Sequence, residues 1–224
     1  MPRRDEHEYE ERRQQIISGA LAVFSQKGFE NATNKDIARA AGIGSPGLIY
    51  HYFKNKADLF AQVIERRAPG LQLIASGDPM LKGPPHEVLN LLGGMFVATL
   101  SDDEGGALFR MVLGEALRRP EVAEMLNSLG PTRAFAFLTR YLGAQMDAGT
   151  LRRTDPGGAA RCFIGPLFAY VVTRAIFPLP DTATLMPDEM VAVTVEIFLR
   201  GMDYRFPEGS SLETLGPERG LENV

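Results

Sequence analysis

The sequence has few features that could brace a fold covalently or hold it in a membrane. Its 224 residues include one cysteine, Cys162, and no tryptophan. A lone cysteine forms no disulfide within the chain, which excludes a disulfide-stapled domain and favours a reducing compartment. We expect this thiol to be buried and inert. The longest apolar stretch without a charge, residues 162–173, is too short to span a bilayer and contains Gly165-Pro166.

The first residues are charged and no apolar run follows them, so they do not resemble a signal peptide. We therefore expect a cytoplasmic protein. Hydrophobic residues make up 45% and charged residues 23%, which is ordinary for a globular protein. The net charge of −4 divides unevenly, with +2 over residues 1–68 and −6 over the remainder. A basic end suits an anionic partner such as DNA, although +2 alone is weak support.

Apolar residues recur at helical spacing along nearly the whole chain, and no segment alternates strictly as a strand would. The pattern predicts an all-α fold. It predicts a first helix over about 8–27, ended by Gly28, and short helices beginning at Thr33, near Ser45 and after Asn55. Further helices are expected over 86–100, 105–118, 120–128, 131–148, 156–177 and 187–203. The breaker-rich segment 65–85 should hold a domain boundary, and residues 207–224 should be poorly ordered.

The most informative segment runs from Thr33 to Leu59. Thr33 and Asp36 have the spacing of a capping box, and Gly42 supplies a tight turn after two helical turns. Ser45-Pro46 then suits the start of a second helix. Two short helices joined by a glycine-containing turn predict a helix-turn-helix, whose second helix enters the major groove of DNA.

This segment resembles the tetracycline-repressor (TetR) family of transcription factors. The resemblance is carried by residues 22–29 and by Thr33, Ile37, Ala38, Ala41, Gly42, Tyr50, Tyr52, Phe53, Asn55, Lys56 and Leu59. It differs at residues 41–50, which are one residue longer than the family's usual pattern. The resemblance implies a DNA-binding domain at 1–56, linked by the helix from about 57 to an effector-binding and dimerisation domain at 57–206.

The chemistry of the side chains divides the expected DNA contacts into two groups. Hydroxyl and lysine side chains suit phosphates, which set register without reading sequence. The resemblance implies that Tyr50 and Lys56 are such contacts, whereas Thr33 has the alternative role of a helix cap. Exposed residues of the second helix should meet base edges, but none is Arg, Asn or Gln, so bidentate reading of bases is missing. The expected contacts are Thr33, Asn34, Lys35, Ser45, Pro46, Gly47, Leu48, Tyr50, His51, Tyr52, Lys54 and Lys56.

The later helices are rich in aromatic residues and methionine, which suit either a solid core or an adaptable apolar pocket. The resemblance implies an effector pocket, for which the candidate residues are Phe96, Phe109, Met125, Tyr141, Phe163 and Phe168. Arg110, Arg133 or Arg140 would meet an anionic group there, or else lie on a solvated face. The last helix is apolar around most of its girth, so a homodimer through 156–177 and 187–203 is expected.

No catalytic constellation is recognisable. The sequence lacks H-E-x-x-H, G-x-S-x-G, a phosphate-binding loop and a cysteine pair, and its histidines cannot be grouped. Glu115, three and four residues before two arginines, predicts a surface ion pair. We expect no enzyme, metal or cofactor, and interpret the chain as a repressor that binds a palindromic operator and is released by a small apolar molecule. An activator, an all-α enzyme and an interaction adaptor on the same scaffold remain the alternatives.

Overall fold

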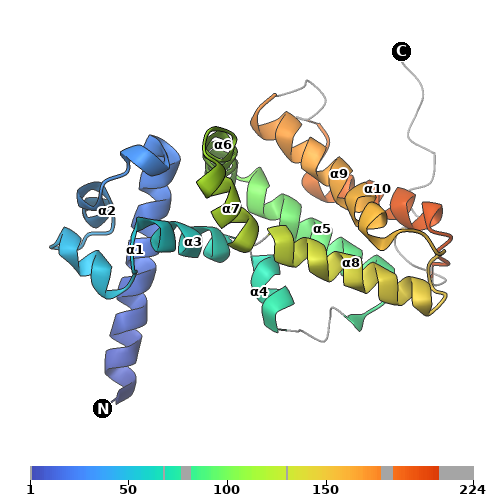
Figure 1. Cartoon of the computed structure of the whole chain (residues 1–224), viewed down its shortest axis with the longest axis horizontal. Helices are drawn as coiled ribbons and strands as arrows, with labels where there is room; N and C mark the ends of the chain where they lie inside the picture. Colours follow the sequence, from blue (N-terminus) through green and yellow to red (C-terminus); the bar gives the residue numbers. More distant parts are fainter. Residues whose placement is uncertain (1, 68, 77–81, 130, 178–183, 207–224) are drawn as a thin grey trace.

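The computed structural model shows an N-terminal head and a larger helical bundle, with one helix running between them (Figure 1). It describes residues 2–67, 69–76, 82–129, 131–177 and 184–206. Every regular element in these ranges is helical, which confirms the predicted all-α class. None of these helices is long and apolar enough to cross a membrane. The tail expected over 207–224 lies outside the described residues.

Four elements form the head and seven form the bundle. The head comprises α1 (Pro2–Asn31), α2 (Asn34–Ala40), the 3-10 helix η1 (Pro46–His51) and α3 (Lys56–Arg67). The bundle comprises α4 (Pro69–Ser76), α5 (Pro85–Ser101), α6 (Asp103–Arg118), α7 (Pro120–Leu129), α8 (Pro131–Asp147), α9 (Pro156–Ala175) and α10 (Pro187–Gly201). The six bundle helices predicted from the sequence agree with α5 to α10 within two residues at each end.

The structure adds one helix to those predicted and corrects the end of another. The breaker-rich segment 65–85 contains α4, because a proline at the first helical position needs no backbone N–H and so begins a helix as readily as it ends one. Gly28 has the expected left-handed φ of 78°, but helical structure resumes after it and continues to Asn31. The glycine therefore kinks the end of α1 rather than terminating it.

The core of the head does not consist of head residues alone. An apolar stripe of α1, made of Ile16, Ala20 and Phe24, is fully buried against side chains of α2 and α3. The same apolar cluster also contains Leu108 from α6 and Val122 from α7. The head and the bundle therefore share a continuous apolar contact where α1 packs against α6.

An ion-pair cluster lies at this junction. Glu115 of α6 pairs with Arg118 and Arg119, as the spacing predicted, but it is not on the surface. Only 7% of Glu115 is exposed, because α6 turns this side chain toward α1 at Gly28. Arg119 also pairs with Glu30 of the head. The expected surface ion pair is therefore a half-buried link between the two parts of the molecule.

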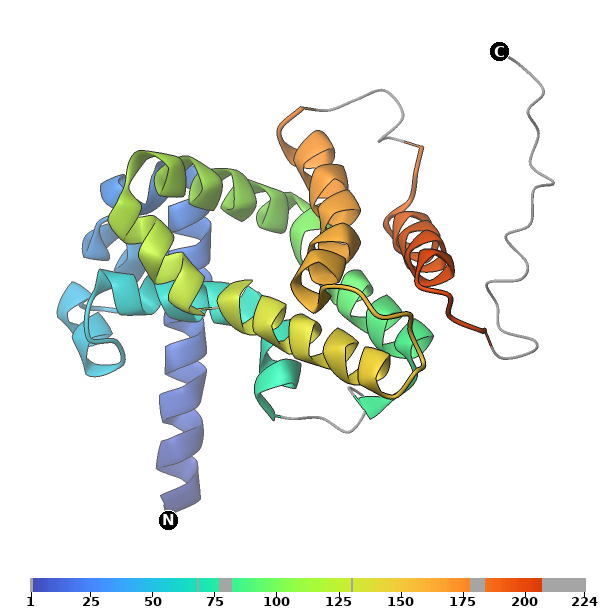
Figure 2. The ribbon, with the colours of Figure 1, turned by 45° about the vertical axis from the view of Figure 1, so that its right-hand side comes forward.

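The bundle has its own core, in which α5 is surrounded by α4, α6, α9 and α10 (Figure 2). Its fully buried residues include Val88 of α5, Leu142 of α8, Phe163 and Leu167 of α9, and Leu199 of α10. At the head end, Arg67 closes α3 onto this bundle with two bonds to Asp102, at 2.5 and 2.7 Å, and one to the carbonyl of Thr99. The C-terminal end of α3 is thus fastened to the bundle.

Short-range interactions fix both ends of α2. The Thr33 hydroxyl accepts from the backbone N–H of Asp36, and the Asp36 carboxylate accepts from the N–H of Thr33, which confirms the capping box. At the other end Gly42 has a φ of 65°, and the N–H of Ile43 donates to the Ala38 carbonyl. This is a Schellman ending, and it turns the chain sharply toward η1.

The crossing of α1 and α2 requires a glycine. A Cβ atom at Gly19 would lie 2.6 Å from the backbone nitrogen of Ala41, closer than such atoms approach. We therefore expect Gly19→Ala to force the two helices apart and to lower the free energy of unfolding by about 1–3 kcal/mol, as overpacking does. Urea denaturation followed by circular dichroism measures this change.

Gly94 of α5 is the matched control, because nothing lies within 4 Å of a Cβ atom added there. Gly94→Ala should raise the free energy of unfolding by up to about 1 kcal/mol, since alanine has the better helix propensity. Equal effects of the two alanines would contradict a steric requirement at Gly19.

The cap of α2 predicts a pH dependence. The Lys27 ammonium, 2.9 Å from Asp36, and the Thr33 hydroxyl lower the pKa of Asp36 from 3.8 to about 2. Since this pKa is depressed on folding, the stabilisation is fully present above about pH 4 and is lost as the pH falls toward 2. The difference in free energy of unfolding between wild type and Asp36→Asn should therefore be largest at neutral pH and should shrink as the pH falls below 4. A difference that stays constant down to pH 2 would refute the assignment.

Candidate nucleic-acid interface

The second helix of the motif, η1, is a short 3-10 helix rather than an α-helix. Ser45 caps it by accepting from the N–H of Gly47, and Pro46 occupies the first position. Ile49 is its one buried residue, and the Ile49 carbonyl accepts from the N–H groups of both Tyr52 and Phe53. Helices of the 3-10 type occur in short pieces, and this one ends after six residues. It leaves Ser45, Pro46, Gly47, Tyr50 and His51 exposed.

A hydrogen bond joins the two helices of the motif. The Asn34 side-chain amide donates to the Tyr50 hydroxyl oxygen at 2.7 Å. Tyr50 is 60% exposed, although it is a large aromatic residue. Because the oxygen already accepts from Asn34, the phenolic O–H is left to donate outward. This is the geometry that a phosphate oxygen requires, and it brings together two of the predicted contacts.

The lysines of the motif have different environments. Lys35 and Lys54 are exposed, and their ammonium groups have no hydrogen bond or ion pair with another described residue. Lys56 is half-buried, and its ammonium donates to the carbonyls of Glu30 and Ala32 at 3.1 and 3.3 Å. It also lies 4.7 Å from the centre of the Phe29 ring. Lys56 therefore closes the end of α1 and keeps one proton for an external acceptor.

The remaining predicted contacts lie around these residues. Thr33 is exposed at the start of α2, where its hydroxyl serves the cap described above. Leu48 and Tyr52 are half-buried and pack against the head core, so each offers only part of its surface. His51 is exposed at the end of η1.

The start of α1 supports this surface, a role that was not predicted from the sequence. The Tyr9 ring packs on Tyr52 with 4.6 Å between ring centres, and the Arg13 guanidinium lies over Phe53 and bonds Gln62. Tyr9 and Arg13 precede Ile16 by seven and three residues, so they extend the buried stripe of α1 toward its start. Their helical spacing from Ile16 could have indicated this role. A search for apolar residues overlooks it, because tyrosine and arginine carry polar groups.

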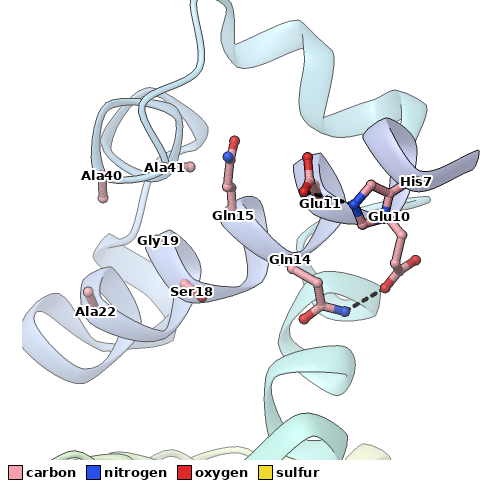
Figure 3. Close-up of a pocket in the computed structure, with 10 residues that line it drawn as sticks. All are labelled: His7, Glu10, Glu11, Gln14, Gln15, Ser18, Gly19, Ala22, Ala40 and Ala41. Carbon is pink, nitrogen blue, oxygen red and sulfur yellow. Dashed lines mark hydrogen bonds and ion pairs between the residues drawn. The ribbon is translucent and has the colours of Figure 1, made fainter. Parts of the chain in front are cut away.

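A surface groove lies between α1 and the end of α2 (Figure 3). Its floor is made of small residues, including Gly19, Ala22 and Ala41, and its wall carries Glu10 and Glu11. His7 pairs with Glu11 at 3.2 Å. Acidic side chains repel phosphate, so we do not count this groove as part of the DNA surface.

The candidate effector residues lie in or beside the core of the bundle. Phe109, Tyr141 and Phe163 are buried, and Phe96 packs against them from a half-buried position. Burial raises the pKa of Tyr141, whose protonated hydroxyl donates to the carbonyl of Gly83 at 2.8 Å. Phe168 is 42% exposed and meets Phe109 edge-on. Met125 lies on α7, but its side chain is outside the described part of the structure.

The outer face of α9 and α10 carries exposed apolar residues. Ile197 is 68% and Val193 40% exposed, and Phe168 lies on the neighbouring helix. Cys162 is also exposed on α9, which corrects the expectation of a buried thiol. A buried stripe on one side of α10 holds Val191, Val195 and Leu199, so the helix is apolar on two faces, one of which is uncovered.

Among the described residues, no three His, Cys, Asp or Glu side chains form a group that could hold a metal ion. His7, His51 and His86 lie on α1, η1 and α5. His86 bonds the Tyr204 hydroxyl at 2.8 Å within the bundle.

Two family models match the chain. Residues 16–63 match the bacterial regulatory proteins of the tetR family, and residues 87–202 match the C-terminal domain of AefR-like transcriptional repressors. The first match covers the helix-turn-helix and the second covers most of the bundle. The resemblance inferred from the sequence is thereby confirmed.

Individual proteins similar to this chain are also transcriptional regulators. The transcriptional regulator AcrR of Shigella flexneri is 43% identical over 65 residues, which cover 29% of this chain and 30% of AcrR. The chain thus matches less than two thirds of the length of its curated relatives. SmeT, the repressor of the Stenotrophomonas maltophilia efflux pump SmeDEF, superposes with a TM-score of 0.65 at 25% identity, over 88% of this chain and 94% of SmeT. The transcriptional regulator FadR of Bacillus subtilis, solved in complex with stearoyl-CoA, superposes with a TM-score of 0.68 at 20% identity, over 84% of this chain and 98% of FadR.

The helix-turn-helix, the bundle behind it and both family matches lead to one conclusion: the chain belongs to the TetR family of DNA-binding transcriptional regulators.

Proposed function

We propose that the protein is a repressor that binds a palindromic operator as a homodimer and leaves it when a small molecule binds the bundle. Residues 1–56 would hold the DNA contacts, and residues 57–206 would hold the effector and dimer surfaces. The observation that carries the proposal is the surface formed by α2 and η1, where Tyr50 is exposed and held by Asn34, while the ammonium groups of Lys35 and Lys54 have no partner among the described residues. Hydroxyl and ammonium donors of this kind are what DNA phosphates accept from.

The side chains of this surface suit contacts to phosphates, which position the protein on DNA, better than contacts that identify bases. Among the exposed residues of η1, none offers the bidentate pattern that distinguishes guanine or adenine in the major groove. Specificity would then rest on His51, on the exposed part of Leu48, on the close approach that Gly47 allows and on the shape of the DNA. Thr33, Asn34, Ser45, Pro46, Tyr52 and Lys56 would complete the contact surface.

The uncovered face of α9 and α10 supports the homodimer. Ile197 and Val193 on α10 and Phe168 on α9 are exposed apolar residues, and a second copy that covered these two helices would bury them. Two heads related by a twofold axis read two half-sites, so a dimer would require a palindromic operator.

The bundle supports an effector-responsive repressor rather than an enzyme or an adaptor. The family matches concern transcriptional regulators, and the C-terminal match is to a repressor domain. We propose that a mostly apolar effector binds near Phe96, Phe109, Met125, Tyr141, Phe163 and Phe168 and lowers operator affinity. We place the protein in the cytoplasm because its target is DNA.

The Asn34–Tyr50 pair provides the test of the DNA surface. Tyr50→Phe removes a donor to phosphate, and we expect it to weaken binding to all DNA sequences by roughly tenfold, since hydrogen bonds to charged groups contribute about 1.5–3 kcal/mol. Asn34→Ala should have a similar effect because it releases Tyr50. The double variant should lose less than the two single losses combined. Fluorescence anisotropy with operator and unrelated duplexes at several salt concentrations measures these affinities.

The loss in Tyr50→Phe should be similar at all salt concentrations, because the tyrosine hydroxyl is uncharged and its phosphate contact releases no counterion. Arg152→Ala, an exposed charge change in the loop after α8, is the control and should change nothing. A loss confined to one base position would show that Tyr50 reads a base, and full additivity of the two variants would refute the coupling.

Neighbouring positions on α10 separate dimer contact from folding. Ile197 is exposed and Val195 is completely buried. Ile197→Glu should leave the circular dichroism spectrum unchanged and convert the dimer to a monomer, because a carboxylate would be buried unpaired only at the interface. Val195→Glu should unfold the bundle. Sedimentation equilibrium at micromolar concentration measures the state, and a wild-type monomer there would refute the proposed interface.

A further inference from the structure

A second groove opens on the outer side of the bundle, between α4 and the N-terminal half of α8. It is lined by Ile74 from α4 and by Arg133, Phe135, Ala136, Thr139 and Arg140 from α8. Arg133 and Arg140, which the sequence analysis offered for an anionic group, line it. The described aromatic candidates Phe96, Phe109, Tyr141, Phe163 and Phe168 do not line it. They form or flank the packed core, so this groove is a separate place for a ligand.

The groove combines an apolar lining with unpaired positive charge. Ile74, Phe135 and Ala136 supply the apolar part. Arg133 and Arg140 are exposed, and neither guanidinium has a hydrogen bond or ion pair with another described residue. Most other arginines of the bundle are engaged, as Arg110 is with the carbonyl of Ala175. Two free guanidinium groups beside an apolar surface favour an anion that also carries hydrocarbon.

The local helix geometry increases the positive potential. Arg133 lies in the first turn of α8, where the helix dipole is positive, and that turn holds no acidic residue. Arg161 of α9 adds a third cation, 4.6 Å from the centre of the Phe135 ring. The Thr139 hydroxyl is covered and has no partner among the described residues, so it remains an unused donor at the wall.

We propose that this groove is a second effector site, separate from the one proposed near the aromatic residues of the core, and that its ligand is an amphipathic oxyanion, with a carboxylate or phosphate head on an apolar chain. Arg133 and Arg140, two helical turns apart, would hold the head, and the chain would lie along Ile74, Phe135 and Ala136. The inference rests on the proposed effector response and specifies its chemistry. The ligand would act on α4, which follows α3 directly along the chain.

The test measures binding to the full-length protein without DNA. Isothermal titration uses four ten-carbon probes below their micelle-forming concentrations: decanoate, decyl phosphate, decyltrimethylammonium and 1-decanol. We expect both anions to bind at one site per chain and the cation not to bind. The tighter of the two anions identifies the head group. Cation binding as tight as that of the anions would overturn the proposal.

Arginine variants locate the site. Arg133→Gln and Arg140→Gln should each weaken anion binding by roughly tenfold or more, as expected for loss of a charge-assisted bond. Arg152→Gln removes an equally exposed charge elsewhere and should leave binding unchanged. All three substitutions are on the surface and preserve most of the side chain, so folding is not at issue. Unchanged anion affinity in both groove variants would overturn the proposed site.

Operator binding separates this inference from the function it rests on. Saturating anion should weaken operator affinity by about 5–150-fold, the range of ordinary allosteric coupling, and the operator should weaken the anion by the same factor. Charge-dependent binding without any change in operator affinity would contradict the effector response and leave the site standing. Operator release by 1-decanol that the arginine variants do not alter would preserve the response and overturn this site.

Discussion

The apolar contact between α1 and α6 is the constraint on which the rest of the structure depends. The head is too small to cover its own hydrophobic stripe, so Leu108 and Val122 of the bundle complete its core. Separating the two parts would expose that surface to water, at about 25 cal/mol for each Å². The orientation of the DNA-binding surface is consequently set by the position of α6. The boundary inferred from sequence breakers divides the chain, but it does not divide the core.

Polar contacts at this junction fix the relative orientation of the head and the bundle, in addition to holding them together. Arg67 at the end of α3 holds Asp102, which also caps α6 through the N–H of Gly105, and the guanidinium lowers the pKa of that carboxyl. One carboxylate therefore positions both the connecting helix and the first turn of α6. On the other side, Arg119 lies between Glu115 and Glu30. Apolar packing alone tolerates sliding, whereas two anchored ion pairs allow few relative orientations.

The sequence was sufficient where structure is determined by neighbouring residues. The capping box of Thr33 and Asp36, the turn at Gly42 and the bounds of α5 to α10 depend on local chemistry, and all were predicted. Predictions failed where the environment of a side chain depends on an element far away in the sequence. The burial of Glu115 depends on α1 lying across α6, and the support of Tyr52 depends on Tyr9, forty-three residues earlier. Tyr50 and Lys56 were proposed as contacts by resemblance and the other contact residues by side-chain chemistry, yet nothing in the sequence indicates that Lys56 closes the end of α1.

The connecting helix explains how a ligand on the bundle would reach the DNA surface. At its start, the N–H of Asp58 donates to Asn55 and the Asp58 carboxylate accepts from the N–H of Lys54, so α3 is tied to the residues that follow η1. Leu59, Phe60 and Val63 embed the same helix in the head core, and Arg67 anchors its far end. A helix held this way moves as a unit rather than bending. A ligand that favours one position of α4 would thus bias the position of η1, by no more than its difference in affinity for the two states.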